Sequence, residues 1–440
     1  MFSVVANLHS LLVVGGKGGG GEIPFKLRVY PMPINRLSSI INLFIFLFFI
    51  TVITIKNAYY IAPLILVLIA IVYLITHYKT IYIDKSVQYY IVAALAYYVI
   101  SLLVAIINHD SIPHSFKPDH FLLLSIPLLL FFIQYKPSLK VLSLAFATAA
   151  ILAGLLAIYN KFFLGIERAF ESIHPIPVAA VIMTLVLYCI TLGLYFLKQG
   201  SRKIASFLII AAIIGLVGNI LTGSRSTWLI FPVAIILLFW VYAKSLKRFM
   251  IPFSFGLISL IVIASLIPQS GIQQRYQAAV SDITQYFDGT KKETSIGMRF
   301  ELWRSALDGI KEKPLLGWGK DGMDEKRLQQ STEDKYPEII KNFPHTHNLF
   351  LEQTFYRGFL GLFVLILLLY VISNYFITTY RNSSNEKKKV IAFLGIINIL
   401  SLLSFSLSDA LLRGKEYAMF FYISNIIFYA MTLTNKNKED

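Results

Sequence analysis

The series of apolar runs is the feature that most constrains this chain. A transmembrane helix needs about twenty predominantly apolar residues, and the sequence holds about a dozen such runs. Of its 440 residues, 56% are hydrophobic and only 15% are charged, whereas soluble domains average roughly 25% charged residues. The alternation typical of a membrane β-barrel is absent. We therefore predict an all-α, polytopic membrane protein with about 12 transmembrane helices.

One long polar interval, between the ninth and tenth runs, divides the series. The fourth run is shorter than the others. The predicted spans are 37–55, 60–77, 88–107, 121–134, 139–158, 177–197, 204–222, 227–243, 250–267, 358–379, 390–408 and 418–434. The predicted organisation is a flexible leader (1–36), helices 1–9 (37–267), a large loop with amphipathic helices (268–357), helices 10–12 (358–434) and a tail (435–440).

The leader is not expected to belong to the fold. Its glycine-rich stretch, Gly15–Gly21, lacks the G-x-x-x-x-G-K-[ST] spacing of a phosphate-binding loop. No cleavable signal pattern is clear, and Met32 is an alternative start. We therefore expect no nucleotide site here.

The basic residues predict the orientation. With the N-terminus inside, the predicted cytoplasmic segments hold twenty Lys and Arg, whereas the short external loops hold seven. Since short cytoplasmic loops carry the positive excess, both termini are expected inside and the large loop outside. The net charge of +16 comes mainly from these cytoplasmic segments, because residues 267–357 hold thirteen basic and thirteen acidic residues and are neutral overall. Membrane lipids, and no nucleic acid, are the expected surroundings.

A predicted amphipathic helix lies in the loop. Residues 298–311 show helical apolar spacing, with Thr294 or Ser295 available as a cap and Pro314 as a stop. Arg299 falls in the middle of the apolar stripe. A charge there must snorkel to water, pair, or bind an anion. The stripe consists of Leu302, Trp303, Ala306, Leu307 and Ile310, and the opposite face of Glu301, Arg304, Asp308 and Lys311.

A second arginine stands at the outer end of the seventh span. Arg225 lies in Gly223-Ser224-Arg225-Ser226-Thr227, in an external loop where Arg opposes the orientation gradient. It lies beside a helix N-terminus, whose free N–H groups and dipole favour anions. The alternative is an ordinary interfacial anchor.

Histidine supplies the candidate base. His347 precedes the tenth span, where Asn348 or Thr346 could cap the helix, and His345 lies two residues before it. Histidine titrates near neutral pH, as a general base requires; a simple capping role is the alternative. No metal is expected, because the histidine spacings match no zinc motif. Weaker candidates for the same outer cavity are Arg168 with His174, and Asp409 with Arg413.

The motifs occur in a fixed order along the chain. They are Gly223-Ser224-Arg225, then Gly297-x-Arg299-x-x-x-Trp303, then Pro314-Leu315-Leu316-Gly317-Trp318-Gly319, and finally His347-Asn348-x-x-Leu351 followed by Gly358 and Gly361. This ordered set, with its loop, resembles the O-antigen ligase family, within the superfamily of O-antigen ligases and polymerases. The resemblance covers roughly residues 160–375 by motif and nearly the whole chain by topology.

The resemblance implies a reaction. Such ligases move a glycan from undecaprenyl diphosphate to a lipid A–core sugar at the periplasmic face of the bacterial inner membrane. By this likeness Arg225 and Arg299 would bind the diphosphate, and His347 would take the proton of the acceptor hydroxyl. His345, Asn348, Trp303, Arg168, Asp409 and Arg413 are possible supporting residues. The family is regarded as metal-independent, no cofactor is expected, and single displacement implies inversion.

Three rival functions remain open. An O-antigen polymerase shares the chemistry, but polymerases often carry two sizeable external loops and an Arg-x10-Gly arrangement, and here one loop is long and no Arg has Gly eleven positions later. A protein O-oligosaccharyltransferase tends to be longer. A transporter would also fit twelve spans, but it predicts pseudo-symmetric halves and midplane charges.

Overall fold

A computed structural model describes residues 34–80, 83–111, 119–171, 174–266 and 272–433, and within these residues it is helical without strands. The main helices are α2 Ile34–Thr54, α3 Ile61–His77, α4 Lys85–Ile107, α6 Asp119–Gln134, α7 Leu139–Ile158, α8 Pro175–Lys198, α9 Arg202–Leu221, α10 Ile230–Leu266, α11 Ile272–Phe287, α12 Ser295–Glu312, α13 Gly319–Thr332, α14 Leu349–Asn382, α15 Glu386–Ser406 and α16 Lys415–Thr432. Short turns are η1 Tyr78–Thr80, η2 Tyr159–Phe163, η4 Arg225–Trp228, η6 Glu338–Asn342 and η7 Leu411–Arg413. The leader lies outside the described residues.

The apolar runs fold as predicted, into helices. Among the described residues, eight helices are long and apolar enough to cross a membrane, and Ile61–His77 and Asp119–Gln134 are shorter apolar helices. The eighth and ninth predicted spans lie in one helix, α10, which is kinked at Leu246 (φ −127°, ψ 28°). The all-helical membrane class is therefore confirmed, whereas the count of twelve crossings stays a prediction.

Helix α8 lies at the centre of the bundle. Of its most apolar window, 89% is buried inside the protein, as expected for a helix that is apolar on all sides. Its neighbours α7 and α9 cross closely, because a Cβ on Gly218 would lie only 2.6 Å from the Cα of Gly154. Small residues at crossings allow such close packing in membrane proteins. This rigid centre carries the turn after α9.

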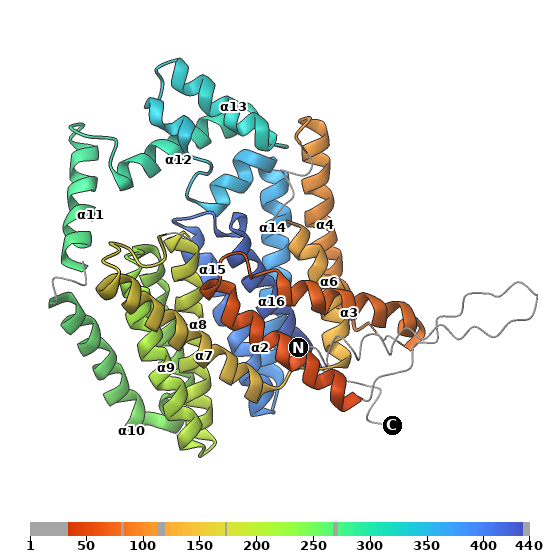
Figure 1. Cartoon of the computed structure of the whole chain (residues 1–440). Helices are drawn as coiled ribbons and strands as arrows, with labels where there is room; N and C mark the ends of the chain where they lie inside the picture. Colours follow the sequence, from red (N-terminus) through yellow and green to blue (C-terminus); the bar gives the residue numbers. More distant parts are fainter. Residues whose placement is uncertain (1–33, 81–82, 112–118, 172–173, 267–271, 434–440) are drawn as a thin grey trace, which may run out of the picture.

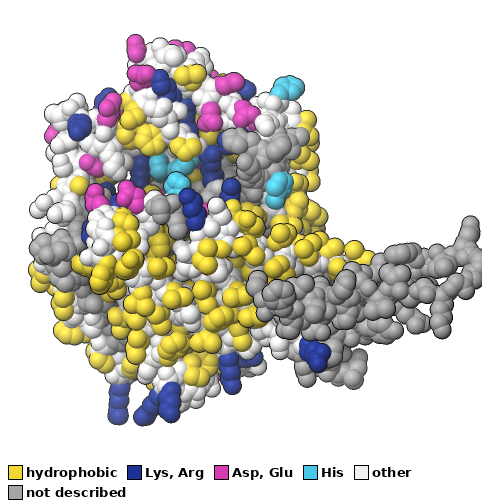
Figure 2. All heavy atoms as spheres, in the orientation of Figure 1, with side chains coloured by type: hydrophobic (Ala, Val, Ile, Leu, Met, Phe, Trp, Pro, Cys, Tyr) yellow, Lys and Arg dark blue, Asp and Glu magenta, His cyan; other side chains and the backbone are white. Residues whose placement is uncertain are grey.

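The polar interval forms a helical cap, here defined as residues 272–348, at one end of the bundle (Figure 1). Met298, Leu302, Tyr336 and Ile340 form one small core within it. Figure 2 shows acidic and basic side chains over the cap, an apolar body beneath it, and further basic side chains at the opposite end. The molecule therefore has one polar end with its own core and one basic end.

Two glycines join the cap to α14. Gly317 and Gly358 have φ of 66° and 64°, in the left-handed region that glycine adopts without steric cost. A Cβ on Gly358 would lie 2.1 Å from the carbonyl oxygen of Leu315, and one on Gly317 2.6 Å from the backbone N of Gly358. The N–H of Phe359 donates to the Pro314 carbonyl at 2.7 Å. The Pro314–Gly319 motif therefore docks on the bend at Gly358, and α14 begins nine residues before this bend, at Leu349.

The predicted helix of the cap is confirmed as α12, and the Thr294 side chain caps it by accepting the N–H of Gly297. Its predicted faces need a correction. Leu307 is 47% exposed, whereas Glu301, assigned to the polar face, is 2% exposed. The reason is that α12 packs against elements on two sides, and the Tyr286 hydroxyl of α11 donates to the Glu301 carboxylate at 2.8 Å. A single amphipathic stripe does not describe a helix with two packed faces.

Candidate active site

Arg225 lies on a braced turn between α9 and α10. Gly223 turns the chain at φ 66°, and the N–H of Ser224 donates to the Thr222 hydroxyl at 3.2 Å. The Thr227 hydroxyl lies 3.0 Å from both the Asn219 side-chain oxygen and the Ser224 carbonyl. Asn219 in turn donates to the carbonyl of Ala179 in α8. Neutral hydrogen bonds thus fix this turn to the centre of the bundle.

Arg299, the fifth residue of α12, reaches the same region from the cap. Burial lowers the pKa of Arg299; Asp409 raises this pKa, and the nearby Arg225 lowers it. An arginine remains protonated despite such shifts. Two guanidinium groups from separate parts of the chain therefore share one electrostatic environment with one carboxylate.

The two histidines face that carboxylate. Asp409, between α15 and η7, places its Oδ1 3.6 Å from His347 Nδ1 and 3.7 Å from His345 Nδ1. The centroids of the two imidazole rings are 4.1 Å apart, and the backbone N–H of His347 donates to His345 Nδ1 at 3.2 Å. Figure 2 shows histidine and basic side chains gathered between the cap and the apolar body. Four distant segments of the sequence thus meet here.

Electrostatics separate the roles of the histidines. Burial lowers the pKa of His345 to about 4, and the neighbouring His347 acts in the same direction. His345 is therefore neutral at neutral pH, and because its Nδ1 accepts a hydrogen bond, its proton lies on Nε2. Burial alone would raise the pKa of Asp409, but its contacts with the two histidines and the Ala410 N–H lower the pKa overall. Asp409 is thus an anion, and His345 offers no lone pair for a substrate proton.

The supporting candidates lie around this cluster. Asn348 caps α14 by accepting the N–H groups of Phe350 and Leu351, and its amide donates to the Leu407 carbonyl near Asp409. Trp303 donates from its indole nitrogen to the Thr346 carbonyl at 2.9 Å. Arg168 donates to the Thr222 carbonyl at 3.1 Å and lies 3.4 Å from the Ser224 hydroxyl, beside the Arg225 turn. Arg413 contacts the Pro344 carbonyl.

Sequence reasoning missed two buried charged residues, Glu352 and Arg327. Each has a side chain only 1% exposed, and their charged groups are 3.8 Å apart. Glu352 gives a weak signal in the sequence, a carboxylate six residues before the predicted tenth span, and it lies in the first turn of the observed α14. Arg327 gives none, because it lies among many charged residues of the loop.

Two further features bear on ligands. In the described part of the chain, His345, His347 and Asp409 have ligand atoms within 4.8 Å of one another, close enough to share a metal ion. The neighbouring Arg299 opposes a cation at that point, since like charges repel. The electrostatics of the cluster favour an anionic ligand.

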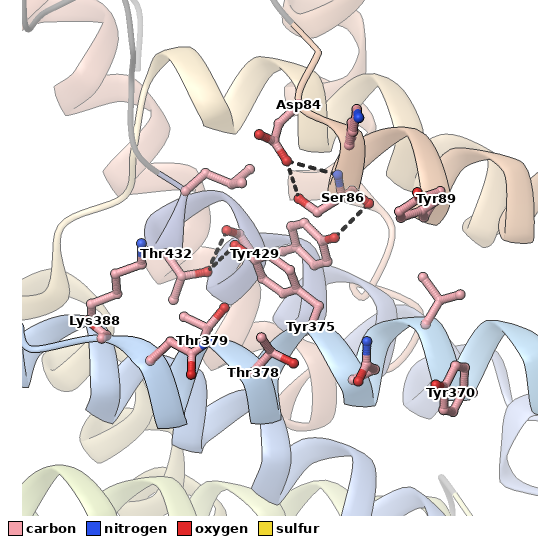
Figure 3. A pocket seen from close by; sticks show the side chains of 16 residues that line it. Asp84, Ser86, Tyr89, Tyr370, Tyr375, Thr378, Thr379, Lys388, Tyr429 and Thr432 are labelled. Atoms are coloured by element: carbon pink, nitrogen blue, oxygen red, sulfur yellow. Dashed lines mark hydrogen bonds between the residues drawn. The ribbon is translucent and has the colours of Figure 1, made fainter.

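A cavity of about 800 Å³ lies far from this cluster, at the opposite end of α14 (Figure 3). The α14 residues that line it begin at Tyr370, more than twenty residues after His347, and its other walls come from the start of α4 and the end of α16. The Tyr375 hydroxyl bonds to the Thr432 hydroxyl, and the Tyr429 hydroxyl donates to the Ser86 carbonyl. The cavity is separate from the candidate site.

The fold and the site define a polytopic membrane protein with arginines, a carboxylate and histidines gathered under a polar cap. Residues 210–366 match the model of a family described as O-Antigen ligase. A Haemophilus influenzae protein, described as an uncharacterized protein, is 33% identical over 395 residues, which are 90% of this chain and 98% of that protein. The ComP-specific O-oligosaccharyltransferase of Acinetobacter baylyi is 28% identical over 193 residues, 43% of this chain and 32% of that protein.

The chain belongs to the O-antigen ligase family. Membership implies a glycosyl-transferring enzyme embedded in a membrane. The matched residues include Arg225, Arg299 and His347, whereas Asp409 lies beyond them. Asp409, a weaker candidate from the sequence, is therefore supported by the geometry and not by the family match.

Proposed function

We propose that this enzyme transfers an O-antigen glycan from undecaprenyl diphosphate to a sugar of lipid A–core, at the periplasmic face of the bacterial inner membrane. The observation that carries the proposal is the joining of Arg225 and Arg299 with the His347–Asp409 pair in one cluster. Two guanidinium groups suit a diphosphate, because each can donate two parallel hydrogen bonds to its oxygens. A base beside them suits attack by a hydroxyl group.

The proposed reaction is one displacement. The acceptor hydroxyl oxygen bonds to the anomeric carbon as the bond from that carbon to the diphosphate breaks, so the configuration inverts. His347 Nε2 takes the hydroxyl proton, and undecaprenyl diphosphate leaves with the electron pair. Arg225 and Arg299 neutralise the charge that develops on it, the task that a metal ion performs in other transferases. We therefore propose a metal-independent reaction.

Asp409 has a defined part in this proposal. Facing His347 Nδ1, it favours the tautomer that keeps the proton on Nδ1 and leaves Nε2 to accept, and it stabilises the imidazolium that forms. The 3.6 Å separation is longer than a hydrogen bond, as catalytic pairs often are before substrate binds. His345, neutral and with Nδ1 occupied, is the weaker candidate for the base.

Profiling of lipopolysaccharide from a deletion strain tests the reaction. The proposal expects lipid A–core without attached glycan, while lipid-linked polymer accumulates. A ladder collapsed to one repeat on the core would identify a polymerase instead. Unaltered lipopolysaccharide with an unglycosylated pilin would identify a protein-modifying enzyme, the second candidate, which the likeness to the ComP-specific O-oligosaccharyltransferase favours.

Sidedness is tested by labelling a single exposed cysteine. Lys291→Cys places a thiol on the exposed surface of the cap, and the native Cys189 is buried. The proposal places the cap in the periplasm and both termini in the cytoplasm, so an impermeant reagent should label intact spheroplasts. Labelling that requires permeabilised membranes would place the cap inside and contradict the proposed location.

A further inference from the structure

We propose that Glu352, with Arg327 and Arg413, is a positioning device for the histidine segment, residues 343–348, and so sets the geometry of the base. This proposal rests on the function proposed for His347. The three charged side chains come from α14, α13 and η7, and none of them touches the reacting atoms. Their contacts converge on the backbone that carries His345 and His347.

The carboxylate of Glu352 holds the centre of the segment. Its Oε2 accepts the N–H of Thr346 at 2.7 Å, the residue between the two histidines. The carbonyl of the same residue accepts the indole N–H of Trp303 at 2.9 Å. Both backbone polar groups of one buried residue, Thr346, are therefore held by side chains from different helices, which fixes the two peptide units on either side of it.

The two arginines hold the start of the segment. Arg327 donates to the Phe343 carbonyl at 2.7 Å, and Arg413 donates to the Pro344 carbonyl. Arg413 also pairs with Glu352 Oε1, and Arg327 Nη2 lies 3.8 Å from Oε2. Because the Glu352 carboxylate lies between the two guanidinium groups, it partly neutralises both cations. Each of the three side chains also bonds to the backbone of the histidine segment.

The held segment has a backbone that needs support. His347 has φ 55°, in the left-handed region that residues other than glycine adopt at a cost and keep only where their surroundings over-determine it. In this conformation the ring lies beside Asp409, the backbone N–H of His347 is bound to His345 Nδ1, and Asn348 caps the next helix. Without Glu352, the N–H of Thr346 loses its acceptor, and the base is free to shift.

Glu352→Gln tests the device, because it keeps the size and removes the charge. The glutamine has one amide oxygen, so it can accept from Thr346 or from Arg413 but not from both in the way that the carboxylate does. Its NH₂ group then faces a guanidinium group. Misplacement of a reacting group by about 1 Å costs on the order of 100-fold, so we expect kcat to fall about 10- to 100-fold. The KM for the lipid-linked donor should change less than about 2-fold, since the contacts described for the Glu352 carboxylate are with Thr346, Arg327 and Arg413. A rise in KM as large as the fall in kcat would overturn a positioning role.

The matched control is Glu338→Gln, an exposed cap carboxylate paired with Lys341, which should leave both constants unchanged.

Epistasis identifies the residue through which Glu352 acts. In a His347→Ala background, Glu352→Gln should produce little further loss, because there is no base left to position. An equal further loss would show that Glu352 acts elsewhere and would overturn the proposal, even if both single variants are impaired.

Trp303 fluorescence provides a readout that is independent of glycan transfer. Subtracting the spectrum of the Trp303→Phe variant isolates the indole that is bonded to Thr346. Glu352→Gln should shift its emission to longer wavelength by a few nanometres, whereas Glu338→Gln should not. An unmoved emission would contradict the device. If Glu352→Gln shifts the emission but the wild-type protein transfers no glycan, the positioning role stands and the proposed function is rejected.

Discussion

The turn that carries Arg225 and the segment that carries His347 face the same site but are held differently. Thr222, Ser224, Thr227 and Asn219 brace the turn through neutral hydrogen bonds, and the Arg168 guanidinium group contacts the Thr222 carbonyl and the Ser224 hydroxyl. The histidine segment is held by buried charged side chains. The contacts described for the turn come from uncharged groups and a guanidinium group, which suits the binding of an anion, whereas the histidine segment is held around a carboxylate, which suits the positioning of a base. Within the proposed function, the turn serves donor binding and the histidine segment serves proton transfer.

The largest effect is expected on the proton-transfer side. His347→Ala should lower transfer about 10²- to 10⁴-fold, the usual contribution of a general base. His345→Ala should lower the transfer rate less, because His345 accepts the backbone N–H of His347 and does not take the substrate proton in the proposed reaction. Initial rates on membranes with matched expression measure both variants. The reverse ranking would move the base to His345, and equal mild effects would reduce His347 to a structural residue.

Next come the arginines on the binding side. Arg225→Lys and Arg299→Lys should each cost about 2 kcal/mol or more of donor binding, because a point charge cannot replace the planar guanidinium fork. Arg304→Lys, on the exposed face of α12 (58% exposed), is the control. Donor titration measures the change. Normal donor affinity in both variants would make these residues interfacial anchors.

A smaller effect is expected from the neutral brace. Thr227→Val keeps the shape but leaves the buried Asn219 oxygen without its hydroxyl partner, a loss of about 1–3 kcal/mol in stability. The displaced turn should raise the KM for donor about 3- to 10-fold with little change in kcat, the opposite of Glu352→Gln. Thr191→Val, buried in α8 with a bond only to its own helix, is the matched control. A fall in kcat with an unchanged KM would contradict the assignment of donor binding to the Arg225 turn and of proton transfer to the histidine segment.

The smallest effect is a pH dependence of stability. The pKa of His345 is about 4 in the folded chain, below its ordinary 6.5, so the unfolded chain binds more protons between these values. The stability involved is present above about pH 6.5 and is lost as the pH falls toward 4. Thermal midpoints of the purified protein should follow this window, and His345→Asn should flatten it. An unchanged slope in that variant would assign the dependence to other groups.

The sequence predicts the bundle well because apolar runs leave a membrane chain few alternatives to helices. The cap helix α12 follows from its spacing and from Thr294, but its buried face does not, since the buried Glu301 bonds to Tyr286 of another helix, a contact that the spacing of α12 cannot show. Glu352 could not be assigned a role from sequence, because its partner Arg413 lies 61 residues away. Contacts of that kind depend on the folded cap and not on local pattern.

The most direct test of the central claim is transfer by the purified chain reconstituted with undecaprenyl-diphosphate-linked glycan and lipid A–core, in the presence of a metal chelator. We expect the core to gain the glycan, with inverted configuration at the new bond, and we expect His347→Ala and Arg299→Lys to lose this product. A core that remains unmodified while lipid-linked glycan lengthens, or while a pilin acceptor is glycosylated, would contradict the proposed reaction.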